Sequence, residues 1–236
     1  FTPRRELERN DIAVPYGASE MMMYALEKGG IDAAVTVCDG AGTVISANPS
    51  LVQGVGARMN GLFLTSPVTE TIQGIEKMEG VVLDPETAVI DQVAGFEKAA
   101  EMGYEKIAVT VNGFTDTDMS LIRNAEERLR VKGICISVCT SGISAERAEH
   151  IAENADMVWS CASGDVREAA GKRALIQVTL AIPVFAVTEN GLEFLSCYAS
   201  DPGVVTGIDR SKQYLMAGNI KGTPLKMGVY STFLAE

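Results

Sequence analysis

Short apolar segments alternate with segments of helical periodicity along most of this chain. The apolar segments are rich in Val, Ile and Ala and have the length of buried strands; they lie at residues 33–38, 81–83, 107–111, 134–138, 157–160 and 182–187. The segments between them repeat apolar residues every three or four positions, as at Ile122, Ala125 and Leu129. Strands that alternate with helices form βαβ units. The pattern therefore predicts an α/β fold with a mostly parallel sheet of about six strands and helices on both faces.

The expected helices start at residues that favour helix N-termini, and most of them end at glycine. They begin near Ser19, Ser66-Pro67, Asp116, Ser144 and Asp165; for a further helix, with Val93, Phe96 and Ala100 on one face, the sequence marks no start. Residues 48–61 are glycine-rich without a period, so we expect a loop there. Asp39-Gly40 is typical of a hairpin turn, which leaves the connection after the first strand open. We expect one domain over residues 1–236, with a less regular part from about residue 192.

Composition narrows the class of protein. The chain has 236 residues, of which 47% are hydrophobic, enough for a full core. Its net charge of −11 comes from acids spread along the chain, which argues against nucleic acid or an anionic membrane as a partner, because Lys/Arg patches bind both. The longest apolar stretch, residues 174–187, is shorter than the roughly 20 residues that cross a bilayer.

The cysteines and the first residues indicate a cytoplasmic protein. The five cysteines are an odd number and widely spread, unlike the disulfide framework of a small secreted domain. Residues 1–9 lack the apolar core of a signal peptide. Because Phe1 is not an initiator methionine, we expect the natural chain to begin further upstream.

Three apolar strands end in cysteine, at Cys38, Cys139 and Cys161, and a fourth ends at Asn112. In a parallel sheet the carboxyl ends of the strands share one edge, where open α/β folds bind ligands. Thiolates there suit zinc or an iron–sulfur cluster. The alternative is ordinary core packing, since cysteine is often buried and no C-x-x-C spacing is present. Packing is also the role expected for Cys135 and Cys197.

The turns after two of these strands are small and polar. Ser141-Gly142 and Ser163-Gly164 each lead into a helix, where free N–H groups can bind phosphate or carboxylate. The alternative for the serines is helix capping.

Carboxylates lie at or beyond the strand ends, at Asp39, Asp84, Asp91 and Asp165. Gathered together they would bind Mg²⁺ or act as acid and base. The alternative is turn and cap chemistry, which aspartate favours.

A glycine-rich segment, residues 53–61, fails both common phosphate-loop patterns. Met59 occupies the final glycine position of the dinucleotide fingerprint, and no Gly-Lys-Ser/Thr is present. We interpret the segment as a plain connector; the alternative is a flexible loop that carries Arg58 toward an anionic ligand.

His150 is the only histidine and lies about six residues into the helix that starts at Ser144. At about 1.5 Å per residue it is about 9 Å from the helix start, away from the strand ends. A histidine-dependent triad at that edge is therefore not expected.

Several segments resemble a known family; they are residues 1–5, 16–20, 37–44, 51–54, 82–88 and 155–163. Across nearly the whole chain the sequence is similar to the methanogenesis marker protein 8 family. The resemblance implies a cytoplasmic protein of methane-metabolising archaea or related anaerobes, without an assigned activity or established catalytic residues. An anaerobic setting also favours thiol-bound Fe–S or nickel chemistry.

The sequence predicts that the protein binds a small anionic ligand, metal or cofactor at the strand-end edge. Its expected role is in the maturation of a cofactor or an enzyme of methane metabolism. The expected ligand-binding residues are Cys38, Asp39, Gly40, Asp84, Asn112, Ser141, Gly142, Ser163 and Gly164. The expected metal ligands are Cys38, Cys139 and Cys161, holding an Fe–S cluster or Zn. The alternative is a non-catalytic assembly partner of a methane-metabolism enzyme. The sequence identifies neither a reaction nor an oligomeric state.

Overall fold

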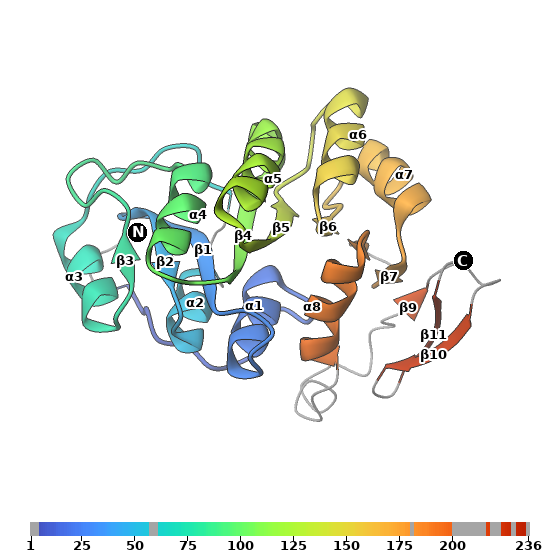
Figure 1. Cartoon of the computed structure of the whole chain (residues 1–236), viewed down its shortest axis with the longest axis horizontal. Coiled ribbons are helices and arrows are strands. Elements are labelled where there is room, and N and C mark those ends of the chain that lie inside the picture. Colours follow the sequence, from blue (N-terminus) through green and yellow to red (C-terminus); the bar gives the residue numbers. More distant parts are fainter. Residues whose placement is uncertain are drawn as a thin grey trace.

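A mixed sheet with helices on both faces organises the chain (Figure 1). The computed structural model describes residues 5–56, 61–179 and 182–199, together with three strands at 216–217, 223–227 and 230–234. In these ranges the main sheet has nine strands in the order β3-β2-β1-β4-β5-β6-β8-β7-β9. The α/β class predicted from the sequence is confirmed.

Four parallel strands form the centre of the sheet: β1 (Ala33–Cys38), β4 (Lys106–Asn112), β5 (Lys132–Val138) and β6 (Met157–Trp159). Antiparallel strands extend it on both sides; they are β2 (Gly42–Ser46), β3 (Val81–Val82), β8 (Val184–Ala186), β7 (Ile176–Val178) and β9 (Met216–Ala217). A separate hairpin pairs β10 (Thr223–Met227) with β11 (Tyr230–Leu234).

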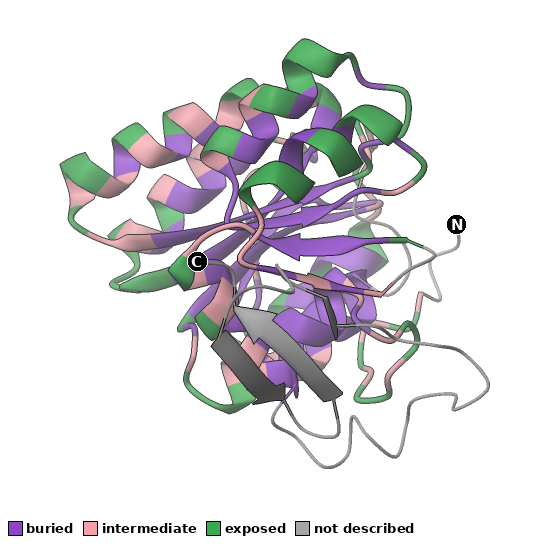
Figure 2. Ribbon diagram, turned by 90° about the vertical axis from the view of Figure 1, so that its right-hand side faces the viewer, coloured by how far each residue is buried: buried purple, intermediate pink, exposed green. Residues whose placement is uncertain are grey.

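Helices cover the two faces of the sheet. One face carries α1 (Ala18–Glu27), α2 (Pro49–Gly56) and α8 (Glu189–Ala199), with α3 (Thr69–Lys77) packed beside α2. The other face carries α4 (Gln92–Glu101), α5 (Thr117–Leu129), α6 (Ala145–Asn154) and α7 (Gly164–Arg173). Figure 2 shows the buried strands as a layer between these helices.

The central strands are apolar along their whole length because both of their faces are covered. In β5, Ile134 and Ile136 pack against the α1 and α8 side, whereas Cys135 packs against the α5 and α6 side. Side chains alternate in direction along a strand. Two covered faces therefore replace the usual apolar and polar alternation with a continuous apolar run.

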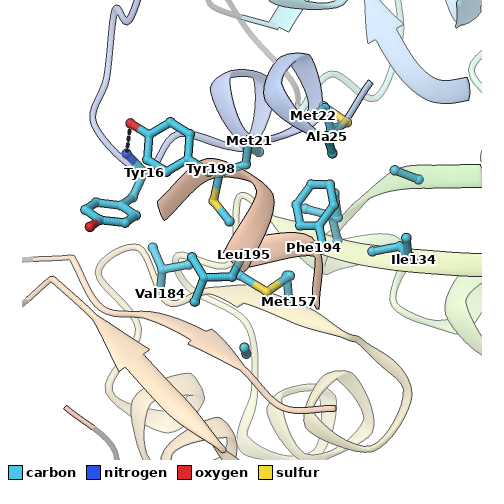
Figure 3. Packing of buried hydrophobic residues seen from close by; sticks show 14 of the residues in the cluster. Tyr16, Met21, Met22, Ala25, Ile134, Met157, Val184, Phe194, Leu195 and Tyr198 are labelled. Carbon is cyan, nitrogen blue, oxygen red and sulfur yellow. Dashed lines mark hydrogen bonds between the residues drawn. The ribbon is translucent and has the colours of Figure 1, made fainter. Parts of the chain in front are cut away.

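Aromatic side chains join α8 to the segment before α1 (Figure 3). The Tyr16 N–H donates to the Tyr198 hydroxyl at 3.1 Å, and the two rings meet edge to face at 5.2 Å. The indole Nε1 of Trp159 donates to the Tyr16 carbonyl at 2.9 Å. These contacts fix the start of α1 over the end of β6.

The prediction of a loop over residues 48–61 is wrong, since residues 49–56 form α2. Pro49 stands at the first helical position, where its missing N–H costs no hydrogen bond. Asn48 accepts from the Leu51 N–H at 3.2 Å and so caps the helix. The glycines conceal the helical period, and one of them is required: a Cβ at Gly54 would lie 2.0 Å from the Leu7 carbonyl oxygen.

The expectation of about six mostly parallel strands is met only in the centre of the sheet. The Asp39-Gly40 turn forms a hairpin into β2, with Gly40 and Gly42 at φ of 85° and 73°. Left-handed conformations of this kind favour glycine. At the other side, residues 176–186 contain two antiparallel strands, β7 and β8, where the apolar pattern predicted one.

Two helices differ from the predicted boundaries. The first, α3, begins at Thr69 after Val68, and not at Ser66-Pro67; the Val68 N–H donates to the Gly40 carbonyl at 2.8 Å and holds the preceding segment against the hairpin turn. The second, α8, runs to Ala199, through residues for which the periodicity predicted no element. Its buried residues Phe194, Leu195 and Tyr198 do follow helical spacing.

A buried carboxylate connects four elements at the start of β6. Asp156 is 1% exposed; its Oδ2 accepts from the Arg123 guanidinium at 2.6 Å and from the Cys135 N–H at 2.8 Å. Its Oδ1 accepts from the Thr188 hydroxyl at 2.5 Å. Thus α5, β5 and the residues leading into α8 are all bound to β6 through one side chain.

No helix in the described residues is long and apolar enough to cross a membrane.

Replacement of Asp156 by Ala tests the importance of this carboxylate. We expect the free energy of unfolding to fall by about 3 kcal/mol, because the partly buried Arg123 guanidinium loses one of its two carboxylate partners, the buried Cys135 N–H loses its acceptor and the Thr188 hydroxyl loses its acceptor as well. Urea denaturation followed by circular dichroism measures the change. Glu168→Ala, which removes an exposed ion pair with Lys172, is the control and should change stability little. Equal effects of the two variants would contradict the assignment.

Candidate functional site

The carboxyl ends of β1, β4, β5 and β6 lie on one edge of the sheet, because these strands are parallel. The turns after β5 and β6 are bound to each other there. Ser141 Oγ accepts from the Ala162 N–H at 3.2 Å, and the Thr140 hydroxyl donates to the Trp159 carbonyl at 2.7 Å. The two turns therefore form one connected surface.

A cysteine follows each of the two strands. Cys139 is exposed and Cys161 is partly exposed, and both have left-handed backbone, with φ of 56° and 47°. Partial burial raises the pKa of the Cys139 thiol, and the charge of Cys161 raises this pKa further. The structure thus places two of the three predicted thiols in the neighbouring turns after β5 and β6.

The segment before α3 passes over the ends of β4 and β5. Asn112 Nδ2 donates to the Gly61 carbonyl at 2.9 Å, and Asn112 Oδ1 accepts from the Phe114 N–H at 3.0 Å. A Cβ at Gly61 would lie 2.1 Å from Cys139 Sγ. Asn112 therefore holds the backbone at residue 61 against the Cys139 thiol.

The turns lead directly into helix N-termini. Ser144 accepts from the Arg147 N–H at 3.3 Å and caps α6, and Ser163 accepts from the Val166 N–H at 3.2 Å and caps α7. The capping interpretation is therefore confirmed for Ser163. The glycines at the turns remain open, since a Cβ at Gly142 or Gly164 would meet no atom within 4 Å.

Ser160 lies just before Cys161 and is fully buried. Its N–H donates to the Pro183 carbonyl at 3.0 Å, so the backbone is still paired with the neighbouring chain. Val158 packs against the α6 and α7 side, and alternation places the Ser160 side chain, two residues later, on that same side. Its hydroxyl has no hydrogen-bond partner among the described residues. A buried hydroxyl without a partner costs free energy unless a ligand or water satisfies it.

Cys38 does not join the other two thiols. It is fully buried in a cluster with Val44, Leu51 and Val55 on the α2 side. Burial raises the pKa of its thiol to about 11. Since β4 lies between β1 and β5, two strand spacings of about 4.8 Å separate Cys38 from the β5 end. Within the described residues, no group of three or more His, Cys, Asp or Glu side chains is placed to hold a metal.

Other segments of the chain already occupy the hydrogen-bonding groups of the hairpin turn after β1. The Thr65 hydroxyl donates to Asp39 Oδ1 at 2.6 Å and accepts from the Gly40 N–H at 2.9 Å. Arg5 donates to the Asp39 carbonyl at 3.2 Å. Asp39 and Gly40 therefore lie apart from the turns after β5 and β6 and have partners already.

The remaining aspartates act in turns and caps. Asp84 accepts from the Thr87 hydroxyl at 2.6 Å and from the Glu86 N–H at 3.0 Å; the bonds from Thr87 lower its pKa. Asp91 caps α4 by accepting from the Ala94 N–H at 2.9 Å. Asp165 lies in the first turn of α7. These carboxylates do not gather into a site.

The structure also places the histidine, the two remaining cysteines and the arginine that the sequence analysis singled out. His150 lies beyond the first turn of α6, as expected, but not at the solvated position expected for it: it is half-buried, and its Nε2 is buried with no hydrogen-bond partner among the described residues. Cys135 is fully buried in the core, and burial raises the pKa of its thiol, whereas Cys197 is partly exposed on α8. Arg58 lies outside the described residues.

Sequence reasoning missed an exposed apolar cluster beside the edge. The rings of Phe63 and Phe114 meet edge to face at 5.8 Å and are 61% and 41% exposed. Leu64 is 85% exposed. The apolar run at residues 62–64, inside a loop, was the available signal. We call Phe63, Leu64 and Phe114 the apolar patch.

These features define a mixed α/β protein with two thiols and two open helix N-termini at the strand-end edge. Residues 1–199 match a family described as "Uncharacterized protein conserved in archaea (DUF2099)", and the chain belongs to this family. It is 42% identical over 201 residues to "Uncharacterized protein MJ0054" of Methanocaldococcus jannaschii, covering 85% of this chain and 70% of that protein. The expectation of an archaeal family is thereby confirmed, whereas the likeness to the methanogenesis marker protein 8 family stays a prediction.

One solved structure shows a distant likeness. It is a chain of the F420-reducing NiFe hydrogenase complex from Methanosarcina barkeri, with a TM-score of 0.43 and 13% identity, covering 93% of this chain and 78% of that chain. A TM-score at this level does not establish a shared fold.

Thiol alkylation tests the placement of the cysteines. In the folded protein under mildly alkaline conditions, we expect iodoacetamide to modify Cys139 first, because Cys139 is exposed whereas the other cysteines are partly or fully buried; the raised pKa of its thiol makes the reaction faster as the pH rises. Cys38 and Cys135 should react only after unfolding, since burial raises the pKa of both thiols. Peptide mass spectrometry over a time course measures the order. Labelling of Cys38 as fast as that of Cys139 would contradict the structure.

Proposed function

We propose that this protein binds a small anionic ligand or cofactor at the turns after β5 and β6, and serves methane-linked cofactor or enzyme maturation. The binding residues we assign are Asn112, Ser141, Gly142, Ser163 and Gly164, with Cys139 and Cys161 beside them. Cys38, Asp39, Gly40 and Asp84, expected from the sequence, are left out because their own contacts place them elsewhere.

The observation that carries the proposal is the buried Ser160 hydroxyl beside two open turns. It has no partner among the described residues, and it lies on the side of the sheet where α6 and α7 begin. Glycine at 142 and 164 leaves space for close approach to the backbone. Free N–H groups at helix N-termini attract anions. A ligand oxygen seated there would satisfy the hydroxyl and the N–H groups together.

The positive potential for such a ligand comes from backbone groups and not from basic side chains. Arg147 is paired with Asp116 at 3.2 Å and also donates to the Phe114 carbonyl. Arg167 donates to the Cys161 carbonyl at 3.3 Å. Binding through N–H groups suits one phosphate or carboxylate group, whereas a polyanion needs a patch of Lys and Arg.

The proposed role in methane metabolism rests on the similarity of the sequence to the methanogenesis marker protein 8 family. Membership of an archaeal family and the relative from Methanocaldococcus jannaschii support it. An Fe–S or zinc site at Cys139 and Cys161 would need further ligands from outside the described residues.

Titration with inorganic phosphate tests the anion site. We expect backbone amide resonances of residues 141–145 and 162–166 to shift with saturation in NMR spectra. Gly164→Asp should abolish these shifts, because a carboxylate at the first position of α7 repels the anion and competes for the same N–H groups.

Gly171→Asp is the matched control for this titration. It adds the same charge to an exposed position of α7, seven residues further along, or about 10 Å from the helix start. Phosphate binding should persist in this variant. Shifts confined to other residues, or equal loss in both variants, would refute the anion site.

The alternative function, an assembly partner of a methane-metabolism enzyme, is favoured by the apolar patch. Exposed Phe63 and Leu64 lie next to the strand-end edge, and exposed aromatic residues of this kind contribute strongly to protein interfaces.

Substitution of the apolar patch tests this alternative. An enzyme that co-purifies with the tagged protein from archaeal cells should be lost with the double variant Phe63→Ser and Leu64→Ser. It should be retained with Leu121→Ser, which removes a 51% exposed leucine from α5. Retention with all of these variants would exclude the patch as the interface.

A further inference from the structure

Two thiols on adjacent turns, one exposed and one partly exposed, form a pair that the anion site does not explain. Cys139 follows β5 and Cys161 follows β6, and these strands are parallel neighbours. The hydrogen bond from the Ala162 N–H to Ser141 Oγ holds the two turns together at 3.2 Å. The charge of Cys161 also raises the pKa of the Cys139 thiol, after the larger effect of burial.

The ends of the two strands place the cysteines in neighbouring turns. Ile136 pairs with Met157, and Ser137 with Val158. Cys139 is the first residue after β5, and Cys161 is the second residue after β6. The Thr140 hydroxyl donates to the Trp159 carbonyl at 2.7 Å, so the chain beyond the two strand ends stays side by side. A disulfide between the two residues requires Cα atoms about 4.4–6.8 Å apart, and formation of the bond tests this separation.

The other cysteines cannot compete for this role. Cys38 and Cys135 are fully buried. Cys197 is partly exposed, but it lies on α8, on the face of the sheet opposite to α6 and α7. Among the described residues, Cys139 and Cys161 alone combine exposure with adjacent positions at the strand-end edge.

We propose that Cys139 and Cys161 form a redox-active dithiol that exchanges with low-molecular-weight disulfides. The Cys139 thiolate attacks one sulfur of the small disulfide, whose S–S bond breaks and releases one thiol. The Cys161 thiolate then attacks the Cys139 sulfur of the mixed disulfide and releases the second thiol. The two protein thiols are oxidised to one disulfide, the small disulfide is reduced to two thiols, and the protons of the cysteines end on these thiols.

The exchange does not depend on anion binding, so the two proposals can fail separately. A Cys139→Ser and Cys161→Ser double variant should still show the phosphate-dependent amide shifts. Exchange without phosphate-dependent shifts in the wild-type protein would refute the anion site alone, and shifts without exchange would refute the dithiol alone.

The test is incubation of the whole, fully reduced chain with glutathione disulfide in the absence of oxygen. We expect two equivalents of glutathione to be released for each chain. The mass of the chain should fall by two hydrogens, and trypsin should yield residues 133–147 linked to residues 148–167. Because residues 133–147 also contain Cys135, fragmentation of the linked peptides must place the bond at Cys139.

Single variants separate the two steps. Cys161→Ser should accumulate a glutathione adduct on Cys139 and release only one equivalent, since no second thiol resolves the mixed disulfide. Cys197→Ser is the matched control and should behave as the wild type. Stable glutathione adducts on both Cys139 and Cys161 in the wild-type protein, or a bond to Cys135 or Cys197, would overturn the proposal.

Discussion

The contact between Asp156 and Cys135 fixes how β6 lies along β5, and the candidate site depends on it. The Asp156 N–H donates to the Cys135 carbonyl at 2.8 Å, and the Asp156 carboxylate accepts from the Cys135 N–H at the same distance. Only two further residue pairs join β5 to β6. A slip of one residue would reverse the face of every side chain in β6. The position of Cys161 beside the β5 turn therefore follows from a buried carboxylate at the opposite end of the strand.

The two faces of the sheet differ in how the strand-end edge is closed. On the α1 side the edge is filled by the chain itself: the buried Glu20 carboxylate accepts from the Ala13 and Val14 N–H groups and from Gln53 Nε2 at 3.0 Å. Trp159 and Tyr16 complete this closure. On the α6 and α7 side the turns keep open glycines and an unsatisfied buried hydroxyl. The α1 side also holds a buried acceptor without a partner among the described residues, Gln53 Oε1, so the open glycines are what distinguishes the α6 and α7 side.

Much of the fold follows from local patterns, and the site follows only in part. Alternating strands and helices predict the parallel centre, and the shared edge predicts that Cys139 and Cys161 meet. Strand order is a long-range property, so the sequence could not show that β4 separates Cys38 from them. The glycines of α2 hide its helical pattern of apolar residues in the sequence. Gly54 is required there because the backbone of Leu7 passes too close for a side chain. The unsatisfied hydroxyl of Ser160 is invisible in sequence, because serine at a strand end usually finds a partner.

The central claim is that the turns after β5 and β6 bring Cys139 and Cys161 together at one site. The most direct measurement is fluorescence after reaction with a bifunctional thiol reagent that emits only when both of its ends are alkylated. The structure predicts strong fluorescence in the wild-type protein and its loss in Cys139→Ser and in Cys161→Ser. A dark wild-type protein, or fluorescence that survives either substitution, would contradict the account.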